Sequence, residues 1–252
     1  MDLGLAGRVY IVTGGAGGLG RATAEVLVGE GAHVVLSGRH QNTVDEAVSE
    51  LGKDNAAGVV ADNADPATPG RLIEVAKERF GGLHGALISV GGPTPGSLMA
   101  SKDEDWNAAY ESVFLGAIRL SREIALNLGA DGALAFVLSS SVKAPLAGLA
   151  ISNGFRPGLA MVAKNLADEL GPRGIRVNGL MPGRVETARI QELDAGSGDA
   201  DAARQRHITS IPLSRYGRPE EFGRAAAFLL SPAASYITGA MLPVDGGMLR
   251  AL

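Results

Sequence analysis

The chain of 252 residues contains no cysteine, which excludes disulfide bonds, thiolate metal sites and cysteine nucleophiles. It also lacks a basic excess: the formal net charge is −4, which argues against a nucleic-acid-binding surface. No run of 18 apolar residues occurs, so the sequence predicts no membrane span. The first residues lack the basic and apolar regions of a signal peptide. These absences together predict a cytoplasmic protein.

Ligand-type spacing of histidines is absent as well. The four histidines are scattered along the chain and are expected in surface or packing roles, so the sequence predicts no metal site: His33, His40, His84 and His207. Hydrophobic residues make up 46% and charged residues 20% of the chain, as in an ordinary globular protein. The length suits one α/β domain with a sizeable core.

Short apolar segments alternate with helical stretches along the whole chain. Strands are expected at residues 8–13, 32–37, 58–61, 83–89, 133–138, 174–180 and 241–244, and helices at 19–30, 41–51, 66–80, 102–129 and 152–170. Near-continuous apolar strands separated by helices predict a parallel, doubly wound sheet with helices on both faces and ligands at the carboxyl ends of the strands. We therefore expect a single domain over residues 1–252. Residues 194–203 are rich in Gly, Ala, Ser and Asp, which predicts a flexible flap at about 188–210.

A glycine-rich loop follows the first expected strand and opens the first helix. Residues 13–20 (TGGAGGLG) fit a turn that brings the backbone close to a pyrophosphate, with the helix N-terminus directed at the anion. Glycines alone are weak evidence, but the strand–loop–helix context makes a dinucleotide site a specific prediction. The expected phosphate-binding residues are Gly14, Gly17, Gly18, Leu19 and Gly20.

The residues after the second strand bear on the choice of dinucleotide. Ser37, Gly38 and Arg39 stand where a carboxylate would bond the adenosine ribose of NAD. That carboxylate is missing and a guanidinium follows, which favours the 2′-phosphate of NADP(H), with NAD(H) kept as an alternative. Asp62 and the adjacent Asn63, after the third strand, are expected at the adenine.

With these motifs the chain resembles the short-chain dehydrogenase/reductase family, and within it the reductases of the 3-oxoacyl-carrier-protein type. The likeness is carried by residues 13–20, Asp62, the serines at 139–141, residues 170–187 (LGPRGIRVNGLMPGRVET), 217–221 (GRPEE) and 235–247 (SYITGAMLPVDGG). It implies a Rossmann-type seven-stranded sheet, NAD(P) binding, a small carbonyl or alcohol substrate, and a homotetramer or homodimer. It also implies further cofactor contacts at Val90, Gly91, Arg156, Pro182, Gly183, Val185 and Thr187.

The catalytic segment departs from the family pattern. The family serine falls on Ser139, but its tyrosine falls on Ser152, its lysine on Arg156 and its helix asparagine on Val113. A serine hydroxyl is far less acidic than a tyrosine hydroxyl, and an arginine does not relay protons. Loss of a positioned general acid typically lowers the rate by about 10² to 10⁴. Oxyanion stabilisation by Ser139 and Arg156 retains part of such catalysis.

Three functions therefore compete. The first is an NADP(H)-dependent oxidoreductase that reduces a carbonyl or oxidises a secondary alcohol, with Ser139, Ser152 and Arg156 as its catalytic set. The second is a catalytically inactive member that binds the cofactor or a partner subunit. The third, a halohydrin-dehalogenase-like enzyme, has a precedent for arginine but keeps the tyrosine and lacks the intact glycine loop. Lys143 and Tyr216 are auxiliary candidates that we expect rather on the surface.

Overall fold

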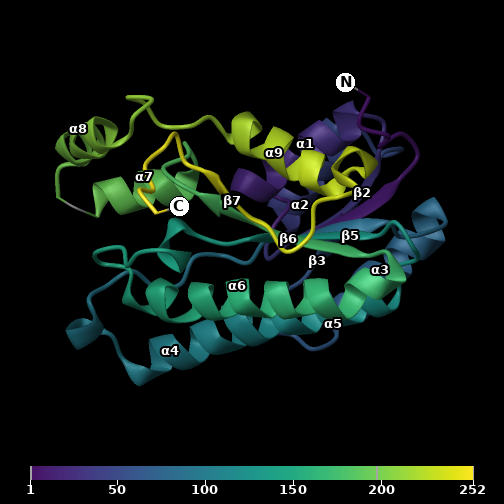
Figure 1. Cartoon of the computed structure of the whole chain (residues 1–252), viewed down its shortest axis with the longest axis horizontal. Coiled ribbons are helices and arrows are strands. Elements are labelled where there is room, and N and C mark those ends of the chain that lie inside the picture. The colour runs from purple at the N-terminus through teal and green to yellow at the C-terminus, as the bar shows by residue number, and fades with distance from the viewer. Residues whose placement is uncertain (1, 197, 252) are drawn as a thin grey trace.

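A single parallel sheet forms the centre of the computed structural model, which describes residues 2–196 and 198–251 (Figure 1). Its strands follow the order β3-β2-β1-β4-β5-β6-β7, and every neighbouring pair is parallel. The strands are β1 (Val9–Val12), β2 (His33–Gly38), β3 (Ala56–Val60), β4 (Gly85–Ile88), β5 (Ala133–Val137), β6 (Arg176–Pro182) and β7 (Met241–Val244). The predicted doubly wound seven-stranded α/β fold is confirmed.

Helices cover both faces of the sheet because the strands are apolar on both sides. One core cluster joins the sheet to α3, α5 and α6, and the other joins it to α1, α2 and α9. Figure 1 shows these two groups of helices on opposite sides of the strands. The α-helices are α1 (Gly18–Gly29), α2 (Gln41–Leu51), α3 (Thr68–Phe80), α4 (Asp103–Ala109), α5 (Gly116–Leu126), α6 (Ala150–Leu170), α7 (Ala188–Ala195), α8 (Ala200–Ser210) and α9 (Pro219–Leu230).

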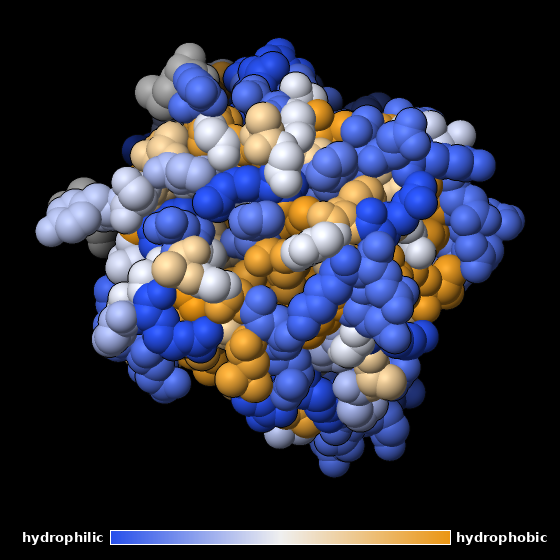
Figure 2. Space-filling model, turned by 90° about the vertical axis from the view of Figure 1, so that its right-hand side faces the viewer, coloured by the Kyte–Doolittle hydropathy of each residue, from blue (hydrophilic) through white to orange (hydrophobic). Residues whose placement is uncertain are grey.

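The order of the strands fixes where a ligand can enter. The chain builds β1, β2 and β3 in one direction and then returns to place β4 beside β1. In such sheets the loops diverge at the carboxyl ends of these two neighbours and leave a crevice there. α7 and α8 lie at this end, at the left of Figure 1. The opposite end shows apolar patches separated by hydrophilic side chains (Figure 2).

Two expected elements differ in detail from the structure. The helix expected over residues 102–129 is divided: a π-helical segment, Tyr110–Leu115, separates α4 from α5. The flap expected over residues 188–210 contains two helices, α7 and α8, and residue 197 between them lies outside the described residues. None of the helices in the described chain is long and apolar enough to cross a membrane.

Candidate active site

The glycine loop between β1 and α1 has the geometry that the sequence predicts. Gly14 and Gly18 have φ angles of +61° and +53°, which side chains disfavour. A Cβ on Gly20 would lie 2.4 Å from the Gly14 carbonyl oxygen, so this position admits no side chain. The N-cap residue of α1 is Gly17, which has no side chain that could accept hydrogen bonds from the first N–H groups of the helix. The first N–H groups of α1 are therefore available to an anion.

Thr13 connects this loop to the neighbouring strand. Its hydroxyl donates to the Ser89 carbonyl oxygen at 2.9 Å and accepts from the Ser89 N–H at 2.8 Å. Ser89 follows β4, so the side chain joins the carboxyl ends of β1 and β4 across the crevice. The crevice thereby gains one fixed edge.

The segment after β2 lies directly against the glycine loop. The Ser37 carbonyl oxygen accepts a hydrogen bond from the Ala16 N–H at 3.4 Å. A Cβ on Gly38 would approach the Ala16 Cβ to 2.7 Å and a Val44 methyl group to 3.0 Å. Arg39 is exposed and forms no ion pair with any described residue. An aspartate at position 38 would therefore require the glycine loop to shift, and the exposed guanidinium of Arg39 stands next to it.

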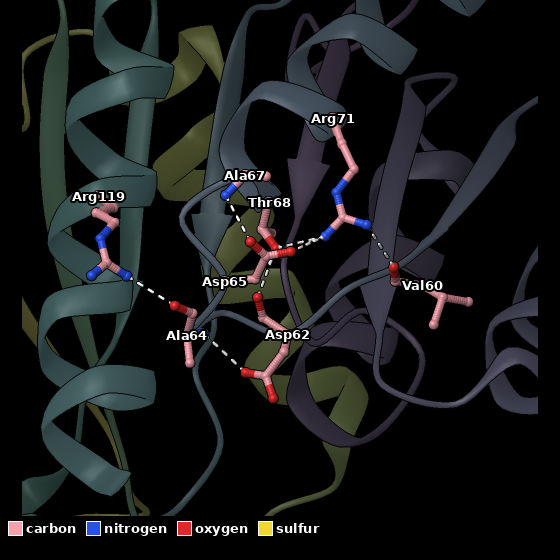
Figure 3. A network of polar contacts seen from close by, with 8 residues as sticks. All are labelled: Val60, Asp62, Ala64, Asp65, Ala67, Thr68, Arg71 and Arg119. Atoms are coloured by element: carbon pink, nitrogen blue, oxygen red, sulfur yellow. Dashed lines mark hydrogen bonds and ion pairs between the residues drawn. The ribbon is translucent and has the colours of Figure 1, made fainter. Parts of the chain in front are cut away.

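The loop after β3 is held by arginines from two helices (Figure 3). The Asp62 Oδ1 atom accepts from the Ala64 N–H at 2.9 Å. Arg119 of α5 donates to the Ala64 carbonyl oxygen at 3.0 Å, and Arg71 of α3 pairs with Asp65 at 2.7 Å. The second Asp62 carboxylate oxygen makes no hydrogen bond within the described chain and stays available to a ligand.

A cavity of about 630 Å³ lies at the carboxyl ends of the strands. Its wall joins the glycine loop, the segments after β4 to β6, and α7 and α8. Of the sequence-predicted site residues it brings together Gly14, Gly17, Gly18, Leu19, Val90, Gly91, Ser139, Arg156, Pro182, Gly183, Val185 and Thr187. Gly20, Ser37, Arg39, Asp62, Asn63 and Ser152 lie outside this wall.

Ser139 and Ser152 differ in their access to the cavity. Ser139 lines it and accepts a hydrogen bond at its Oγ from the Ser141 N–H at 3.1 Å, which leaves its hydroxyl proton free to donate. Ser152 lies in the first turn of α6, is 8% exposed and is not part of the cavity wall. The serine at the position of the family tyrosine is therefore buried within the protein and does not line the cavity.

Arg156 is buried, and its guanidinium is bonded to the backbone. It donates to the carbonyl oxygens of Val137 at 2.7 Å, Val90 at 3.1 Å and Gly91 at 3.1 Å. No carboxylate of the described residues pairs with it, and burial lowers the pKa of Arg156 to about 10. The burial of a cation without partners costs on the order of several kcal/mol. The three carbonyl oxygens offset this cost because they accept hydrogen bonds from the guanidinium. Arg156 therefore joins α6 to the ends of β4 and β5 and places one positive charge at the cavity wall.

The position of the family asparagine is occupied by a residue without polar atoms. Val113 lies in the π-helical segment and is 3% exposed, within the hydrophobic core. π-helical turns inside α-helices are frequent at functional sites. This chain has the π-helical turn, but Val113 has no polar atom that could form a hydrogen bond there.

An ionic cluster anchors the helices that cover the cavity. Asp194 of α7 is buried and accepts from Arg184 at 3.0 Å and from the Tyr216 hydroxyl at 2.9 Å. Arg204 of α8 lies 4.4 Å from the centre of the Tyr216 ring and pairs with Glu186. Tyr216 is buried at 3% exposure, so the surface position expected for it is wrong. Burial and the bond to Asp194 raise the pKa of Tyr216 to about 12, which makes it a poor proton donor.

Sequence reasoning missed His207, which lines the cavity from α8. The signal is the helical spacing of Ala203, His207 and Ser210: the first is buried, and the other two face the cavity. Residues three and four apart share one helix face. The sequence predicted only a surface or packing role for this histidine, whereas the structure places it at the wall of the cavity.

Comparisons with known proteins agree with the fold and with the family resemblance. The family model described as enoyl-(acyl carrier protein) reductase matches residues 14–249. The 3-oxoacyl-[acyl-carrier-protein] reductase FabG of Salmonella typhimurium is 33% identical over 244 residues, 96% of this chain and 97% of that protein. A short-chain dehydrogenase/reductase of Brucella melitensis superposes with a TM-score of 0.93 at 29% identity, over the full length of both chains. The L-sorbose reductase of Gluconobacter frateurii, solved with NADPH and L-sorbose, superposes with a TM-score of 0.92 at 31% identity, also over both full lengths.

Proposed function

The chain belongs to the short-chain dehydrogenase/reductase family, and from this premise we propose that it is an NADP(H)-dependent oxidoreductase that reduces a carbonyl compound or oxidises a secondary alcohol. One observation carries the proposal: a single cavity of about 630 Å³ joins the glycine loop to Ser139 and Arg156. The relatives support it, since they include reductases of a 3-oxoacyl group and of L-sorbose by their names. From the family resemblance we also propose a single domain and a cytoplasmic homodimer or homotetramer.

The residues of the crevice fit a dinucleotide. The uncapped N-terminus of α1 would bind the pyrophosphate, and the free carboxylate oxygen of Asp62 would accept from the adenine amino group. Arg39, with no ion pair in the described chain, would bind the 2′-phosphate of NADP(H), and the closed space at Gly38 disfavours the carboxylate that suits NAD(H). The nicotinamide half would contact residues of the cavity wall after β4 and from the end of β6 onward: Val90, Gly91, Pro182, Gly183, Val185 and Thr187.

Ser139 and Arg156 can stabilise the charge that develops on the substrate oxygen. When bound, the nicotinamide supplies or accepts hydride. The Ser139 hydroxyl can donate to the carbonyl oxygen, and the Arg156 cation at the cavity wall favours negative charge there. Ser152 contributes neither effect directly because it lies outside the wall.

A second candidate is a catalytically inactive member that binds the cofactor or a partner subunit. Two observations favour it. The guanidinium of Arg156 donates to three backbone carbonyl oxygens, and Ser152 is buried and lies outside the cavity wall. Under this function the protein binds NADPH and turns over no carbonyl compound.

A fluorescence titration with NADPH and NADH side by side tests the cofactor half of the proposal. We expect tight binding of NADPH and weaker binding of NADH. Gly20→Val, which places atoms against the Gly14 carbonyl, should abolish both and provides the matched control.

A screen of NADPH oxidation with ethyl acetoacetate, acetoacetyl-CoA, L-sorbose and 2,3-butanedione then tests the reaction. Binding without any turnover would favour the second candidate, and no binding of either nucleotide would refute the first.

A further inference from the structure

The cavity wall holds very few groups that can exchange a proton. Among the described residues that line it, the ionisable side chains are Arg156, Arg184, Arg189 and His207. Arginines stay protonated in proteins, and serine hydroxyls are too weakly acidic to act as the acid near neutral pH. His207 is therefore the one group of this wall whose charge can change between about pH 5 and 8.

The His207 imidazole is available to a ligand. Neither ring nitrogen forms a hydrogen bond with another described residue, whereas Arg189 donates to the Pro93 carbonyl at 2.7 Å and Arg184 to Asp194 at 3.0 Å. The charged groups that act on His207 are Arg184 before α7, Asp194 of α7 and Arg206 of its own helix. Because the cluster around Asp194 anchors α7 against α8, the imidazole is presented by a fixed part of the wall.

We propose that His207 is the catalytic residue that exchanges the substrate proton, in the place of the missing tyrosine. In the oxidation direction the alcohol gives its hydroxyl proton to the neutral imidazole and its carbon-bound hydrogen, as hydride, to the oxidised nicotinamide. In the reduction direction the imidazolium returns that proton to the substrate oxygen as the carbon receives hydride. This role rests on the proposed oxidoreductase function.

The surroundings of His207 determine how the two directions depend on pH. Burial lowers the pKa of His207, Arg184 and Arg206 act in the same direction, and Asp194 opposes them. The imidazole is then mostly neutral at pH 7, the form that accepts a proton. We expect kcat/KM for reduction to fall as pH rises through this lowered pKa, and kcat/KM for oxidation to rise over the same interval to a plateau.

The test compares His207→Gln with the wild-type protein and with Gln205→Ala, an exposed position on the same helix. The probes are NADPH with ethyl acetoacetate or L-sorbose, followed from pH 5 to 9. We expect His207→Gln to lower kcat by about 10²-fold with a flattened pH profile, while the affinity for NADPH stays within about twofold. His207→Ala should regain rate when free imidazole is added, which a merely structural histidine would not show.

Chemical labelling gives a readout that does not depend on turnover. Diethyl pyrocarbonate modifies neutral imidazoles, and peptide mass spectrometry locates the labelled histidines. NADPH with the ketone should protect His207 in the wild-type protein, while the half-buried His84, which precedes β4 at the opposite end of the sheet, stays reactive. Absence of protection would overturn the role of His207 even if the variants fail to fold.

The outcomes separate the two proposals. A wild-type enzyme that is active, with His207→Gln unchanged in rate and pH profile, overturns the role of His207 and leaves the oxidoreductase function intact. A wild-type protein that binds NADPH but reduces none of the carbonyl compounds overturns the proposed function and the proton exchange with it.

Discussion

The guanidinium of Arg156 donates to the main-chain oxygen of Val137 at 2.7 Å, which connects the second turn of α6 to the end of β5. Two further bonds extend this contact to the segment after β4. The position that carries a lysine in the family thus carries a cation with a different task. It connects α6 to the ends of β4 and β5, and its contribution can be measured as a change in the free energy of unfolding.

Replacement of Arg156 by Met should destabilise the fold. The three carbonyls lose a shared donor, and buried unsatisfied polar groups cost about 1–3 kcal/mol each. We expect a net loss of about 1–3 kcal/mol, because the desolvation cost of the buried guanidinium disappears with it and offsets part of the cost of the three carbonyls. Urea unfolding measures it. Arg156→Lys keeps the charge with a more compact donor and should lose less; equal stability of all three proteins would refute this account.

The double substitution Ser152→Tyr with Arg156→Lys should raise the rate of carbonyl reduction. A tyrosine beside a lysine restores an acid whose pKa is lowered by the neighbouring cation. If the wild-type protein has no working acid, as under the second candidate function, the expected gain is about 10²- to 10⁴-fold in kcat; with His207 as the acid the gain is smaller. NADPH oxidation with ethyl acetoacetate measures it, with each single variant as control. A double variant no faster than the single ones would contradict the role assigned to the missing tyrosine.

Gly38→Asp should not convert the protein to NAD(H). Its Cβ would meet Ala16 at 2.7 Å and Val44 at 3.0 Å, so the carboxylate can enter only if the glycine loop shifts. We expect weaker binding of both nucleotides in the fluorescence titration. Arg39→Gln, in contrast, removes a charge-assisted contact worth about 1.5–3 kcal/mol and should weaken NADPH alone, by roughly 10- to 100-fold. Improved NADH binding by Gly38→Asp would show that the steric argument is wrong.

Tyr216→Phe should loosen the ionic cluster around Asp194. The variant removes the 2.9 Å bond to a buried carboxylate and should cost about 1.5–3 kcal/mol, as for a hydrogen bond to a charged group. The pKa of Tyr216 is raised to about 12 in the folded protein, above its ordinary value of 10.0. Its stabilising effect is then complete below pH 10 and declines as pH rises from 10 through 12. Unfolding curves between pH 8 and 12 should show this decline in the wild-type protein and lack it in Tyr216→Phe.

The sequence predicted the sheet and the glycine loop well because their signals are local. Alternating apolar strands and helices specify the parallel sheet, and the close approach of Gly20 to Gly14 explains why that loop needs glycines. The resemblance to the short-chain dehydrogenase/reductase family is likewise confirmed. The assignments of individual site residues, including Ser139, Ser152 and Arg156, stay predictions.

The contacts over the cavity could not be predicted because they join distant parts of the chain. Tyr216 and Asp194 are 22 positions apart and meet through the packing of α7 against the segment before α9. The burial of Ser152 and the three carbonyls around Arg156 likewise depend on how α6 docks on the sheet. His207 carries no motif, and only the orientation of α8 brings it to the cavity.

The π-helical segment Tyr110–Leu115 has a consequence for the rotation of the helix that contains it. One extra residue in a turn rotates everything beyond it by about 100° around the helix axis. α5 therefore presents Leu120 and Ile124 to the sheet in a phase that a continuous α-helix from Asp103 would not give. Deletion of Ser112 from this segment would rotate both side chains away from the core although no apolar residue was removed.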